Sequence, residues 1–410
     1  MKFCMVTTFY PPFNFGGDGI YVEALSRALV ERGHEVSVVH CVDSFRLKSA
    51  ADDLDGPPEE MRHGVRVHRL RSRLGWLSPL ITQQTGRPGL KSARLREILG
   101  RDFDVVNYHN ISLVGGPAVL SIPAGRALKV WTVHEHWLLC STHIFWKNDE
   151  ARCDKRECLS CCIKSKVPPQ AWRLTGLVDR SLGHVDVMIA PSRFTAELYR
   201  PVVSPKPVHV LPLFVRLKPP VRDEHADATV RSYFLYVGRI TSSKGVKPLL
   251  AQFAGHPGLR IKVAGDGDLL SALREEYKEA ANIELLGPVG ADQLGTLYAG
   301  AIAVVLPSLA PETFGLTVVE GMAFGTPAVV HDAGGCREIV EASEAGFVFT
   351  HFEELPAILV RLQKDAGLWR WLSEQARRAF AANYTVERHV TNYLQLLEVA
   401  RAERIARLDA

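Results

Sequence analysis

The chain has 410 residues, of which 47% are hydrophobic and 23% charged, and its formal net charge is only +4. This length exceeds one typical hydrophobic core and predicts two domains of roughly 200 residues each. The balanced composition excludes a disordered chain, and no apolar run is long enough to span a bilayer. The first residues, MKFCMVTTFYPPF, indicate a core strand rather than a signal peptide, so we expect a cytoplasmic location.

Short apolar strands alternate with longer helical patterns, which predicts an α/β fold with doubly wound sheets. The strand candidates of the first half are residues 3–8, 35–40, 65–70, 105–108, 128–133 and 187–190. A proline-rich stretch over residues 201–220 indicates a linker. Further strand candidates follow at residues 234–237, 260–263, 283–286, 303–306 and 328–330, before a mainly helical stretch over 355–408. Ligands of such sheets bind beyond the carboxyl ends of the strands.

Two glutamates, Glu312 and Glu320, follow the apolar strand at residues 303–306. Gly315 at a helix start would leave backbone N–H groups uncovered, so an anion could approach them and the positive end of the helix dipole. Glu320 would lie about one and a half turns into that helix. One carboxylate could then reach a ribose beside a bound phosphate, and Glu312 a sugar beyond it. The alternative is an ordinary βα unit with two solvated glutamates.

This segment resembles the E-x7-E signature of the family-4 retaining glycosyltransferases with the GT-B fold. Four other segments are similar to that family, namely FYPPFNFGGDG from residue 9, FLYVGRITSSKG from residue 234, IKVAGDG from residue 261 and IELLGPV from residue 283. The resemblance covers nearly the whole chain and implies two Rossmann-like doubly wound domains facing across a cleft. Residues 1–205 would form the acceptor side, 206–385 would bind the nucleotide sugar, and a helix at 386–410 would cross back to the first domain.

The resemblance also implies the site residues. Donor binding falls to Gly16, Gly17, Arg239, Lys244, Gly265, Phe314, Gly315, Leu316 and Glu320, and catalysis to His134 and Glu312. Fixed cations would stabilise the charge that grows on a leaving diphosphate. His134 would hydrogen-bond a donor hydroxyl or shift its charge near neutral pH. His109 is a weaker candidate, for the wall of the cleft. Turn glycines, a solvated cation pair and a satisfied polar histidine are the structural alternatives.

Five of the eight cysteines lie between residues 140 and 162. The spacing of Cys158 and Cys161 is typical of a metal-binding knuckle, and with Cys140 and Cys153 four thiolates would make a structural zinc site. Free thiols, an iron–sulfur cluster and disulfides remain alternatives. Some members of the family have a similar cysteine-rich insertion, here residues 137–166. The resemblance implies that catalysis itself would need no metal, because the donor-domain signature lacks the Asp-x-Asp that holds a divalent ion in the other main glycosyltransferase fold.

Positive charge is concentrated in residues 62–101, which hold ten Lys or Arg against one acid, Glu97, together with Leu74, Trp76, Leu77, Leu80 and Ile81. A basic segment with apolar anchors predicts peripheral contact with an anionic membrane surface or a lipid pyrophosphate. A solvated face or a phosphate-bearing soluble acceptor is the alternative. No nucleic-acid recognition motif accompanies the charge, so we expect no nucleic-acid partner.

The sequence therefore predicts a retaining hexosyltransferase that moves a sugar from a nucleoside diphosphate sugar to a hydroxyl of a saccharide or lipid-linked saccharide, in polysaccharide or glycolipid assembly. Domain closure would exclude water, which competes with the acceptor. A nucleotide-sugar epimerase of the same fold and a non-catalytic nucleotide-sugar-binding protein remain open as alternatives. One departure from the family is LPLFV at residues 211–215, where members commonly have an Asn-Gly pair.

Overall fold

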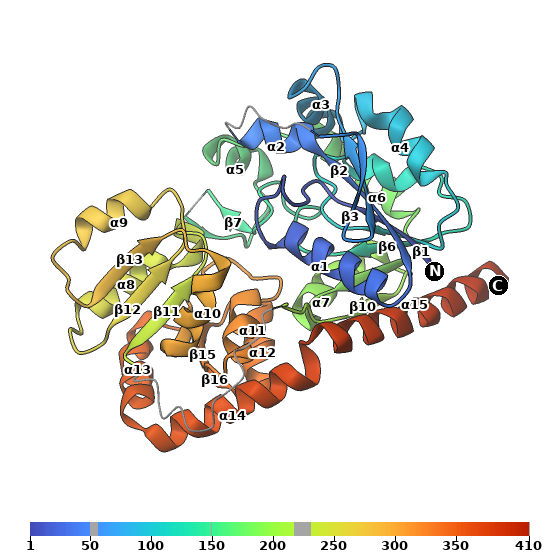
Figure 1. The fold of residues 1–410 in the computed structure, drawn as a ribbon. Coiled ribbons are helices and arrows are strands. Elements are labelled where there is room, and N and C mark those ends of the chain that lie inside the picture. The colour runs from blue at the N-terminus through green and yellow to red at the C-terminus, as the bar shows by residue number, and fades with distance from the viewer. Residues whose placement is uncertain (50–55, 149, 217–230, 410) are drawn as a thin grey trace. The chain divides into compact units, whose positions relative to one another are not determined.

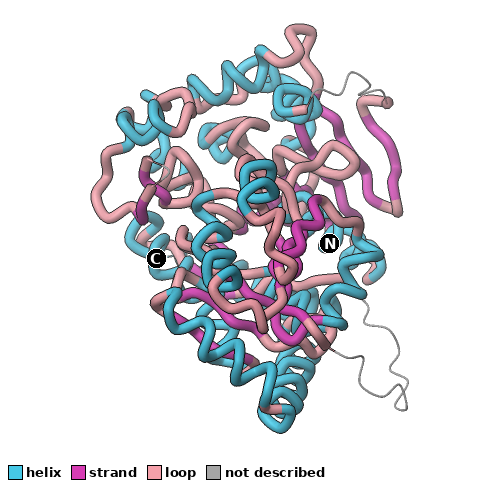
Figure 2. Tube along the Cα trace, turned by 90° about the vertical axis from the view of Figure 1, so that its left-hand side faces the viewer, coloured by secondary structure: helices cyan, strands magenta, loops and turns pink. Residues whose placement is uncertain are grey.

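The computed structural model describes residues 1–49, 56–148, 150–216 and 231–409. The chain forms two compact units, shown in Figure 1. The first comprises Met1–His143, Cys158–Pro212 and Val386–Ala410, and the second comprises Ile144–Glu157 and Leu213–Thr385. Each unit is built on a sheet of mainly parallel strands flanked by helices, drawn as magenta strands and cyan helices in Figure 2. This is the α/β architecture with two doubly wound sheets that the sequence predicts.

The sheet of the first unit runs β10-β9-β6-β5-β1-β2-β4-β3 in the described residues, and only β3 is antiparallel to its neighbour. Its strands are β1 (Lys2–Val6), β2 (Glu35–Cys41), β3 (Glu59–Arg62), β4 (Val65–Leu70), β5 (Val105–Tyr108), β6 (Leu128–Thr132), β9 (Val187–Ala190) and β10 (Val208–Val210). The sequence analysis missed β3 because it is polar, and β10 because it lies in the proline-rich stretch. Residues 217–220 of the predicted linker lie outside the described residues.

The helices of the first unit are α1 (Gly17–Glu31), α2 (Val42–Lys48), α3 (Leu77–Thr85), α4 (Ser92–Leu99), α5 (Cys158–Lys164), α6 (Leu177–Leu182), α7 (Arg193–Val203) and α15 (Val386–Asp409). Three 3-10 turns accompany them, η1 (Gly89–Lys91), η2 (Pro117–Ser121) and η3 (Ala171–Leu174). Helix α15, red in Figure 1, packs against α1. Its Tyr393 hydroxyl accepts a hydrogen bond from Asn107 Nδ2 of β5 at 2.9 Å, so the C-terminal helix is anchored in this unit's core.

The second unit has an all-parallel sheet in the order β13-β12-β11-β14-β15-β16 within the described residues. Its strands are β11 (Tyr233–Val237), β12 (Ile261–Ala264), β13 (Ile283–Gly287), β14 (Ala301–Leu306), β15 (Ala328–His331) and β16 (Gly346–Phe349), and a separate antiparallel pair joins β7 (Trp146–Lys147) and β8 (Ala151–Arg152). Central strand β14 is buried along its whole length, as expected when helices cover both faces of a parallel sheet.

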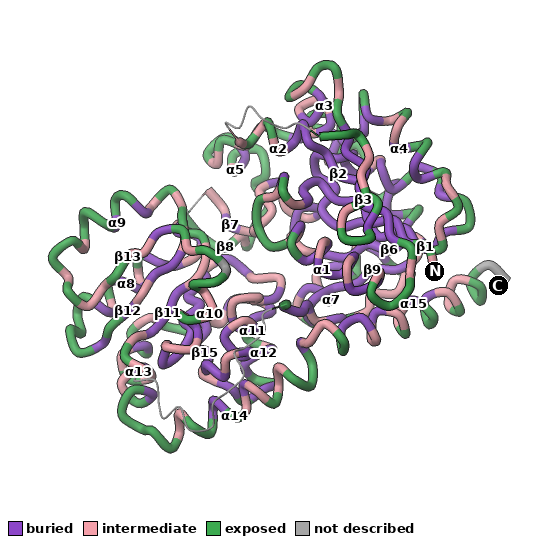
Figure 3. Tube along the Cα trace, viewed as in Figure 1, coloured by how far each residue is buried: buried purple, intermediate pink, exposed green. Residues whose placement is uncertain are grey.

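The helices of the second unit are α8 (Val246–Ala254), α9 (Leu270–Glu276), α10 (Ala291–Gly300), α11 (Leu316–Ala323), α12 (Gly335–Ser343), α13 (Leu355–Lys364) and α14 (Ala366–Asn383), with 3-10 turns η4 (Ser242–Lys244) and η5 (Phe352–Glu354). Each unit has its own hydrophobic core, purple in Figure 3, which contains the apolar side chains of its strands. Of the helices in the described part of the chain, none is both long and apolar enough to cross a membrane.

Candidate active site

Three loops of the second unit carry predicted site residues, and each follows the carboxyl end of a strand. Arg239 follows β11, Gly265 follows β12, and Glu312 lies in the loop between β14 and α11. These strands are neighbours in the order β12-β11-β14-β15, so their carboxyl ends meet at one edge of the sheet. This edge is where ligands of open α/β sheets bind.

Lys244 and Glu312 form a partly buried ion pair at this edge. Lys244 Nζ donates a hydrogen bond to Glu312 Oε1 at 2.6 Å, and the Ser308 hydroxyl donates to the same oxygen. The Lys244 and Glu312 side chains are only 22% and 18% exposed. Burial raises the pKa of Glu312, but Lys244, Ser308 and Arg239 together lower it below its ordinary value. Glu312 is therefore an ionised carboxylate at neutral pH.

The backbone around Gly245 brings Lys244 to Glu312. Gly245 has a φ of +68°, and a Cβ at this position would lie 2.0 Å from the carbonyl oxygen of Pro307. The N–H groups of Leu309 and Ala310 both donate to the carbonyl of Ser243 at 3.0 Å. The loop after β11 therefore lies directly against the loop after β14, and a side chain at Gly245 would force them apart.

A second backbone contact holds Glu312 from the side of β15. The N–H of Glu312 donates to Ala333 O at 3.0 Å, and the N–H of Gly335 donates to Glu312 O at 2.8 Å. Gly334 allows this approach, because a Cβ there would lie 2.4 Å from Glu312 O. The sequence analysis missed both Gly334 and Ser308. The glycine pair at residues 334–335, shortly after strand β15, was the sequence signal that could have identified Gly334.

Helix α11 begins at Leu316, and Gly315 is its N-cap. Gly315 has a φ of +127°, which residues with a side chain rarely adopt, and a Cβ would lie 3.1 Å from Cys336 Cβ. Within the described residues no side chain caps this helix, and its first turn holds no acid. Its first N–H groups are thus uncovered, as the sequence predicts, and favour an anion. Phe314 is buried, and its ring packs against Tyr384 with centroids 6.1 Å apart.

Glu320 lies on α11 in surroundings unlike those of Glu312. Its Oε2 accepts a hydrogen bond from the Tyr298 hydroxyl. Burial raises the pKa of Glu320, and the hydrogen bond from Tyr298 offsets this only in part. No cation is among the groups that shift it. The two glutamates of the motif are therefore shifted in opposite directions. Tyr298 is a further residue that the sequence analysis missed.

Gly265 and Arg239 lie in different surroundings: Gly265 is in close contact with a neighbouring loop, whereas Arg239 is exposed. A Cβ on Gly265 would lie 1.8 Å from Gly238 O, so glycine is required for the two loops to pack. The Gly265 N–H donates to Gly287 O at 2.8 Å, which ties the loop to β13. Arg239 is exposed, while its own carbonyl accepts a hydrogen bond from the Tyr236 hydroxyl at 2.5 Å. The guanidinium is thus available to a ligand and also acts on Glu312.

In the first unit, His134 forms a pair with His109. These residues follow the adjacent strands β6 and β5, and His109 Nδ1 lies 2.9 Å from His134 Nε2. Burial lowers the pKa of His134 to about 4, and burial and then His134 lower the pKa of His109 well below its ordinary value. Both rings are therefore neutral at pH 7. This corrects the expectation that His134 shifts its charge near neutrality and leaves the hydrogen-bonding role.

Tyr21 of α1 lies against the histidine pair, with its ring centroid 5.0 Å from that of His134. The Tyr21 hydroxyl lies 2.8 Å from His389 Nε2, and His389 Nδ1 lies 2.8 Å from Pro212 O. A carbonyl only accepts, so His389 donates through Nδ1 and its Nε2 accepts from Tyr21. This network, contributed by α1 and α15, holds Tyr21 beside His134.

Gly16 is the N-cap of α1 with a φ of +83°, and Gly17 is the first residue of the helix. Asp18 lies in the first turn, and its Oδ2 accepts a hydrogen bond from Asn110 at 3.0 Å. Burial, and then Glu135, raise the pKa of Asp18 to about 6. The sequence analysis overlooked this acid, although it directly follows the two glycines.

The structure lends no support to the zinc hypothesis for the cysteine-rich stretch. Cys140, Cys158 and Cys161 belong to the first unit, whereas Cys153 is on Ile144–Glu157 of the second. Throughout the described ranges, no three His, Cys, Asp or Glu side chains are grouped as metal ligands would be, and none of the eight cysteines is joined in a disulfide. The zinc site therefore stays a prediction, which metal analysis of the purified protein tests directly.

A cation holds the start of the cysteine-rich stretch, residues 137–166. Arg173 donates to Trp137 O at 2.6 Å and to Leu138 O at 2.9 Å, while its Nε donates to Gln170 Oε1 at 2.6 Å. Its guanidinium also lies over the Trp172 ring, 4.8 Å from the centroid. Burial lowers the pKa of Arg173 to about 10, so it remains charged at neutral pH.

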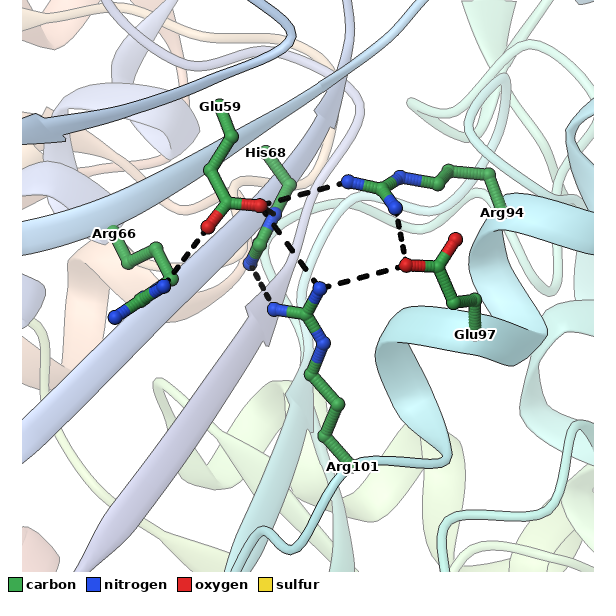
Figure 4. A network of polar contacts seen from close by, with 6 residues as sticks. All are labelled: Glu59, Arg66, His68, Arg94, Glu97 and Arg101. Carbon is green, nitrogen blue, oxygen red and sulfur yellow. Dashed lines mark hydrogen bonds and ion pairs between the residues drawn. The ribbon is translucent and has the colours of Figure 1, made fainter.

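Figure 4 shows that much of the basic segment is ion-paired. Glu59 of β3 contacts Arg66 at 2.9 Å, Arg94 at 3.5 Å and Arg101 at 3.9 Å. Glu97 contacts Arg94 and Arg101. Two more pairs in the first unit are Arg62–Glu23 and Arg69–Glu60. The acids Glu23, Glu59 and Glu60 lie outside residues 62–101, so counting charge within that range overstated the free positive charge.

Four arginines of the segment form no ion pair within the described residues, namely Arg71, Arg73, Arg87 and Arg96. Leu74, Trp76 and Leu77 are 50%, 51% and 38% exposed. Leu80 and Ile81 are partly buried. The exposed apolar and cationic groups are thus fewer than the sequence suggested.

Comparison with known proteins gives consistent matches. The family model Glycosyltransferase Family 4 matches residues 15–218, and Glycosyl transferases group 1 matches residues 218–379. An uncharacterized glycosyltransferase of Methanocaldococcus jannaschii is 25% identical over 98% of this chain and 98% of its own length. Sucrose-phosphate synthase of Thermosynechococcus elongatus has a TM-score of 0.75 at 20% identity, covering 98% of this chain and 99% of its own. HepE of Anabaena in complex with UDP has a TM-score of 0.65 at 17% identity, covering 97% and 100%.

The two family models together match residues 15–379, which includes both sheets. The solved relatives share the fold over nearly the full length of this chain. These matches confirm the fold class and the family that the sequence resembles. The chain belongs to the family-4 glycosyltransferases with the GT-B fold.

Proposed function

We propose that this glycosyltransferase moves a hexose from a nucleoside diphosphate sugar to an acceptor hydroxyl and retains the anomeric configuration. The observation that carries the proposal is the Lys244–Glu312 pair, with Arg239 and the uncapped start of α11 at the same sheet edge. These groups are two cations, an ionised carboxylate and free N–H groups. That combination matches a diphosphate leaving group next to a sugar that gains positive charge.

The donor binds through its diphosphate and its ribose. Arg239 and Lys244 take up the phosphate charge, Arg239 through paired N–H groups and Lys244 as a point charge. The N–H groups after Gly315 add hydrogen bonds and the helix dipole. Glu320 accepts hydrogen bonds from the ribose hydroxyls. HepE of Anabaena, solved in complex with UDP, has the same fold, which agrees with a nucleoside diphosphate donor.

In the reaction, the bond between the anomeric carbon and the diphosphate oxygen breaks, and the acceptor oxygen bonds to that carbon. The proton of the acceptor hydroxyl leaves to the departing diphosphate or to a neighbouring base. Glu312 faces the sugar as an ionised carboxylate, and neutral His134 hydrogen-bonds a sugar hydroxyl. A covalent adduct on Glu312 and attack from the leaving-group face both account for retention. The cations and N–H groups supply the positive charge, so the step proceeds without a divalent ion.

The acceptor is a saccharide or a lipid-linked saccharide used in polysaccharide or glycolipid assembly. Exposed Trp76 and Leu77, together with Arg73, support transient contact with an anionic membrane surface. Co-sedimentation with anionic and neutral vesicles tests this contact, with Trp76→Ser as the variant. Equal sedimentation of variant and parent would remove the membrane from the proposal.

The first test is thermal stabilisation by UDP-, GDP- and ADP-sugars, with the parent nucleotides alongside. Selective binding to the folded state raises the melting temperature, so a shift with one nucleotide series identifies the donor. The selected donor is then incubated with saccharide acceptors, and the anomeric configuration of the product is read by NMR. An inverted product would refute retention, and no stabilisation by any nucleotide would refute donor binding. Conversion of the donor without an acceptor would indicate an epimerase.

A further inference from the structure

A pocket of about 430 Å³ lies in the first unit among α4, η2 and α6. Its volume is within the range of small-molecule sites. No residue of the candidate active site lines it. It instead includes Arg87 and Arg96 from the basic segment, and Arg180 and His184 from or near α6. These groups are almost a hundred residues apart in the sequence, where nothing indicates that they meet.

The three arginines of the pocket have unused hydrogen-bonding capacity. Arg87, Arg96 and Arg180 are exposed, and in the described ranges their guanidinium groups form neither an ion pair nor a hydrogen bond. Their neighbours Arg94 and Arg101, in contrast, are paired with Glu97 (Figure 4). Among the described residues, no acid lines the pocket. Three unpaired guanidinium groups around one hollow attract an anion, since Arg binds phosphate oxygens through parallel N–H groups.

A buried hydroxyl provides an independent observation. Ser181 lines the pocket and is 0% exposed, yet within the described residues its Oγ has no hydrogen-bond partner. A buried polar group without a partner costs free energy, so its persistence needs an explanation. An anion in the pocket would accept the hydrogen bond that the protein does not. Ser92, also in the lining, already donates to Gly89 O at 2.6 Å.

Close packing of two glycines builds the pocket. Gly86 ends α3 with a φ of +66°, and a Cβ there would lie 2.8 Å from Leu177 Cδ2. A Cβ on Gly116, whose φ is +60°, would lie 2.5 Å from the carbonyl carbon of Gly86. The Ala118 N–H donates to Gly86 O at 3.1 Å. The turn that carries Arg87 is therefore held against η2 and α6, which fixes the arginine at the pocket.

Apart from Ser121, the rest of the lining is apolar, contributed by Pro88, Ala118, Ile122, Pro123 and Leu177. Leu90, on η1 between the turn and α4, is 51% exposed. The pocket thus combines a cationic side with an apolar side. His184 reflects the positive surroundings, since burial and then Lys129 and Lys206 lower its pKa.

We propose that this pocket binds a phosphate-bearing ligand with an apolar portion, whose phosphate contacts Arg87, Arg96 and Arg180. The ligand is a lipid headgroup or a free phosphorylated metabolite, since both present the same oxyanion. The proposed donor residues lie in the second unit, so this site stands independently of the proposed function. Occupancy by a lipid would place the first unit at a membrane, and occupancy by a metabolite would make the pocket an effector site.

Hydrogen exchange on the full chain tests the proposal, because it locates protection by segment. Inorganic pyrophosphate, vesicles of phosphatidylcholine with phosphatidic acid, and vesicles of phosphatidylcholine alone are the three probes. We expect protection of residues 86–99, 117–123 and 176–184 with at least one anionic probe. Protection by pyrophosphate indicates a free metabolite, and protection by the anionic vesicles alone indicates a lipid headgroup. Absence of protection with both anionic probes, or equal protection by neutral vesicles, would overturn the proposal.

A matched pair of double variants distinguishes binding in the pocket from general attraction of an anionic probe to positive surface charge. Arg87→Gln/Arg180→Gln should weaken binding of the protecting probe at least about tenfold, because two charged hydrogen-bonding groups are lost. Arg126→Gln/Arg200→Gln removes the same charge from two exposed arginines that lie outside the lining and form no ion pair within the described residues, and it should leave binding within about twofold. Ser181→Ala should weaken it about threefold to tenfold. Equal weakening by both double variants would refute a defined site.

Discussion

Replacing Lys244 by alanine separates its role in folding from its role in turnover. The change removes the cation that lies 2.6 Å from Glu312 and leaves the Ser308 hydroxyl as a donor to the same carboxylate oxygen. Breaking a fully buried ion pair costs about 3–5 kcal/mol, and an exposed pair contributes about 0–1 kcal/mol. The two side chains are about one-fifth exposed, so we expect a loss of about 2 kcal/mol in the free energy of unfolding.

The pH dependence of this loss has a definite sign. Glu312 has a lowered pKa in the folded protein, so the pair's stabilisation is present above the unfolded pKa and is lost as the pH falls through the folded pKa. Without Lys244, burial dominates and raises the pKa of Glu312. The deficit of Lys244→Ala should therefore be largest at neutral pH and should shrink on acidification. Urea denaturation at several pH values measures it.

Turnover should respond far more than stability, because the cation is proposed to stabilise the departing diphosphate. Loss of one such charge-stabilising group typically costs about hundredfold to thousandfold in kcat. The assay follows release of the nucleoside diphosphate from the donor that the nucleotide panel selects. Lys247→Ala is the matched control, since Lys247 is 64% exposed and its nearest acid, Glu276, lies 3.8 Å away. Lys247→Ala should measurably change neither the free energy of unfolding nor kcat.

The double variant Lys244→Ala/Glu312→Gln distinguishes the role of Lys244 in stability from its role in turnover. The double variant removes the unpaired buried charge and should recover most of the lost stability. It should not recover turnover, because both proposed site groups are absent. Recovery of turnover together with stability, or unchanged turnover in Lys244→Ala, would refute the assigned role.

Three further predictions concern single side chains. Tyr298→Phe removes the hydrogen bond to Glu320, so the already raised pKa of Glu320 should rise further. Nucleoside diphosphate affinity, measured by calorimetry, should fall about tenfold. On acidification this affinity should begin to weaken at a higher pH than in the parent. Asp18→Asn should stabilise the protein by about 1–3 kcal/mol near neutral pH, because the raised pKa of about 6 means that stability is lost as pH rises through that value. The gain in the free energy of unfolding, measured by urea denaturation, should vanish toward pH 4, and a gain independent of pH would contradict the assignment. Arg173→Met removes the donors to Trp137 O and Leu138 O and should cost about 2–3 kcal/mol without altering nucleotide affinity; an unchanged unfolding midpoint would show that Arg173 does not brace the loop.

Residues that follow a strand directly could be placed from the sequence. Arg239, Gly265 and His134 come within a few positions of apolar strands, and parallel strands end at a common edge, so their proximity to that edge follows from chain order. The uncapped start of α11 could be predicted because Gly315 has no side chain that could cover the first N–H groups. The order of the strands in each sheet depends on which strands pair, and an apolar run of a few residues does not specify its partner.

Partners contributed by distant segments could not be placed. Tyr298 reaches Glu320 from another helix, and Glu59 reaches Arg94 and Arg101 from an edge strand that carries no apolar pattern. Such contacts depend on packing between elements, which local periodicity does not encode. The same limitation produced the overestimate of free charge in residues 62–101 and concealed the meeting of Arg87 with Arg180. The pKa of His134 likewise depends on burial by neighbouring elements rather than on its position after a strand.

The opposite pKa shifts of Glu312 and Glu320 show why one short motif can hold two chemically different carboxyl groups. A pair of acids whose surroundings separate their pKa values is a common basis for distinct roles in one site. Glu312 owes its negative charge to Lys244, yet the proposed donor diphosphate would compete with Glu312 for that cation. Ser308 also lowers the pKa of Glu312, and its hydrogen bond to the carboxylate would remain when Lys244 and Arg239 turn to the diphosphate. Glu320 has no cation to lose, and the ribose hydroxyls of a bound nucleotide would supply the hydrogen bonds that its buried position lacks. Donor binding would therefore weaken the stabilisation of the Glu312 carboxylate and improve that of the Glu320 carboxylate. Glu312 would accordingly be most reactive when the donor is in place.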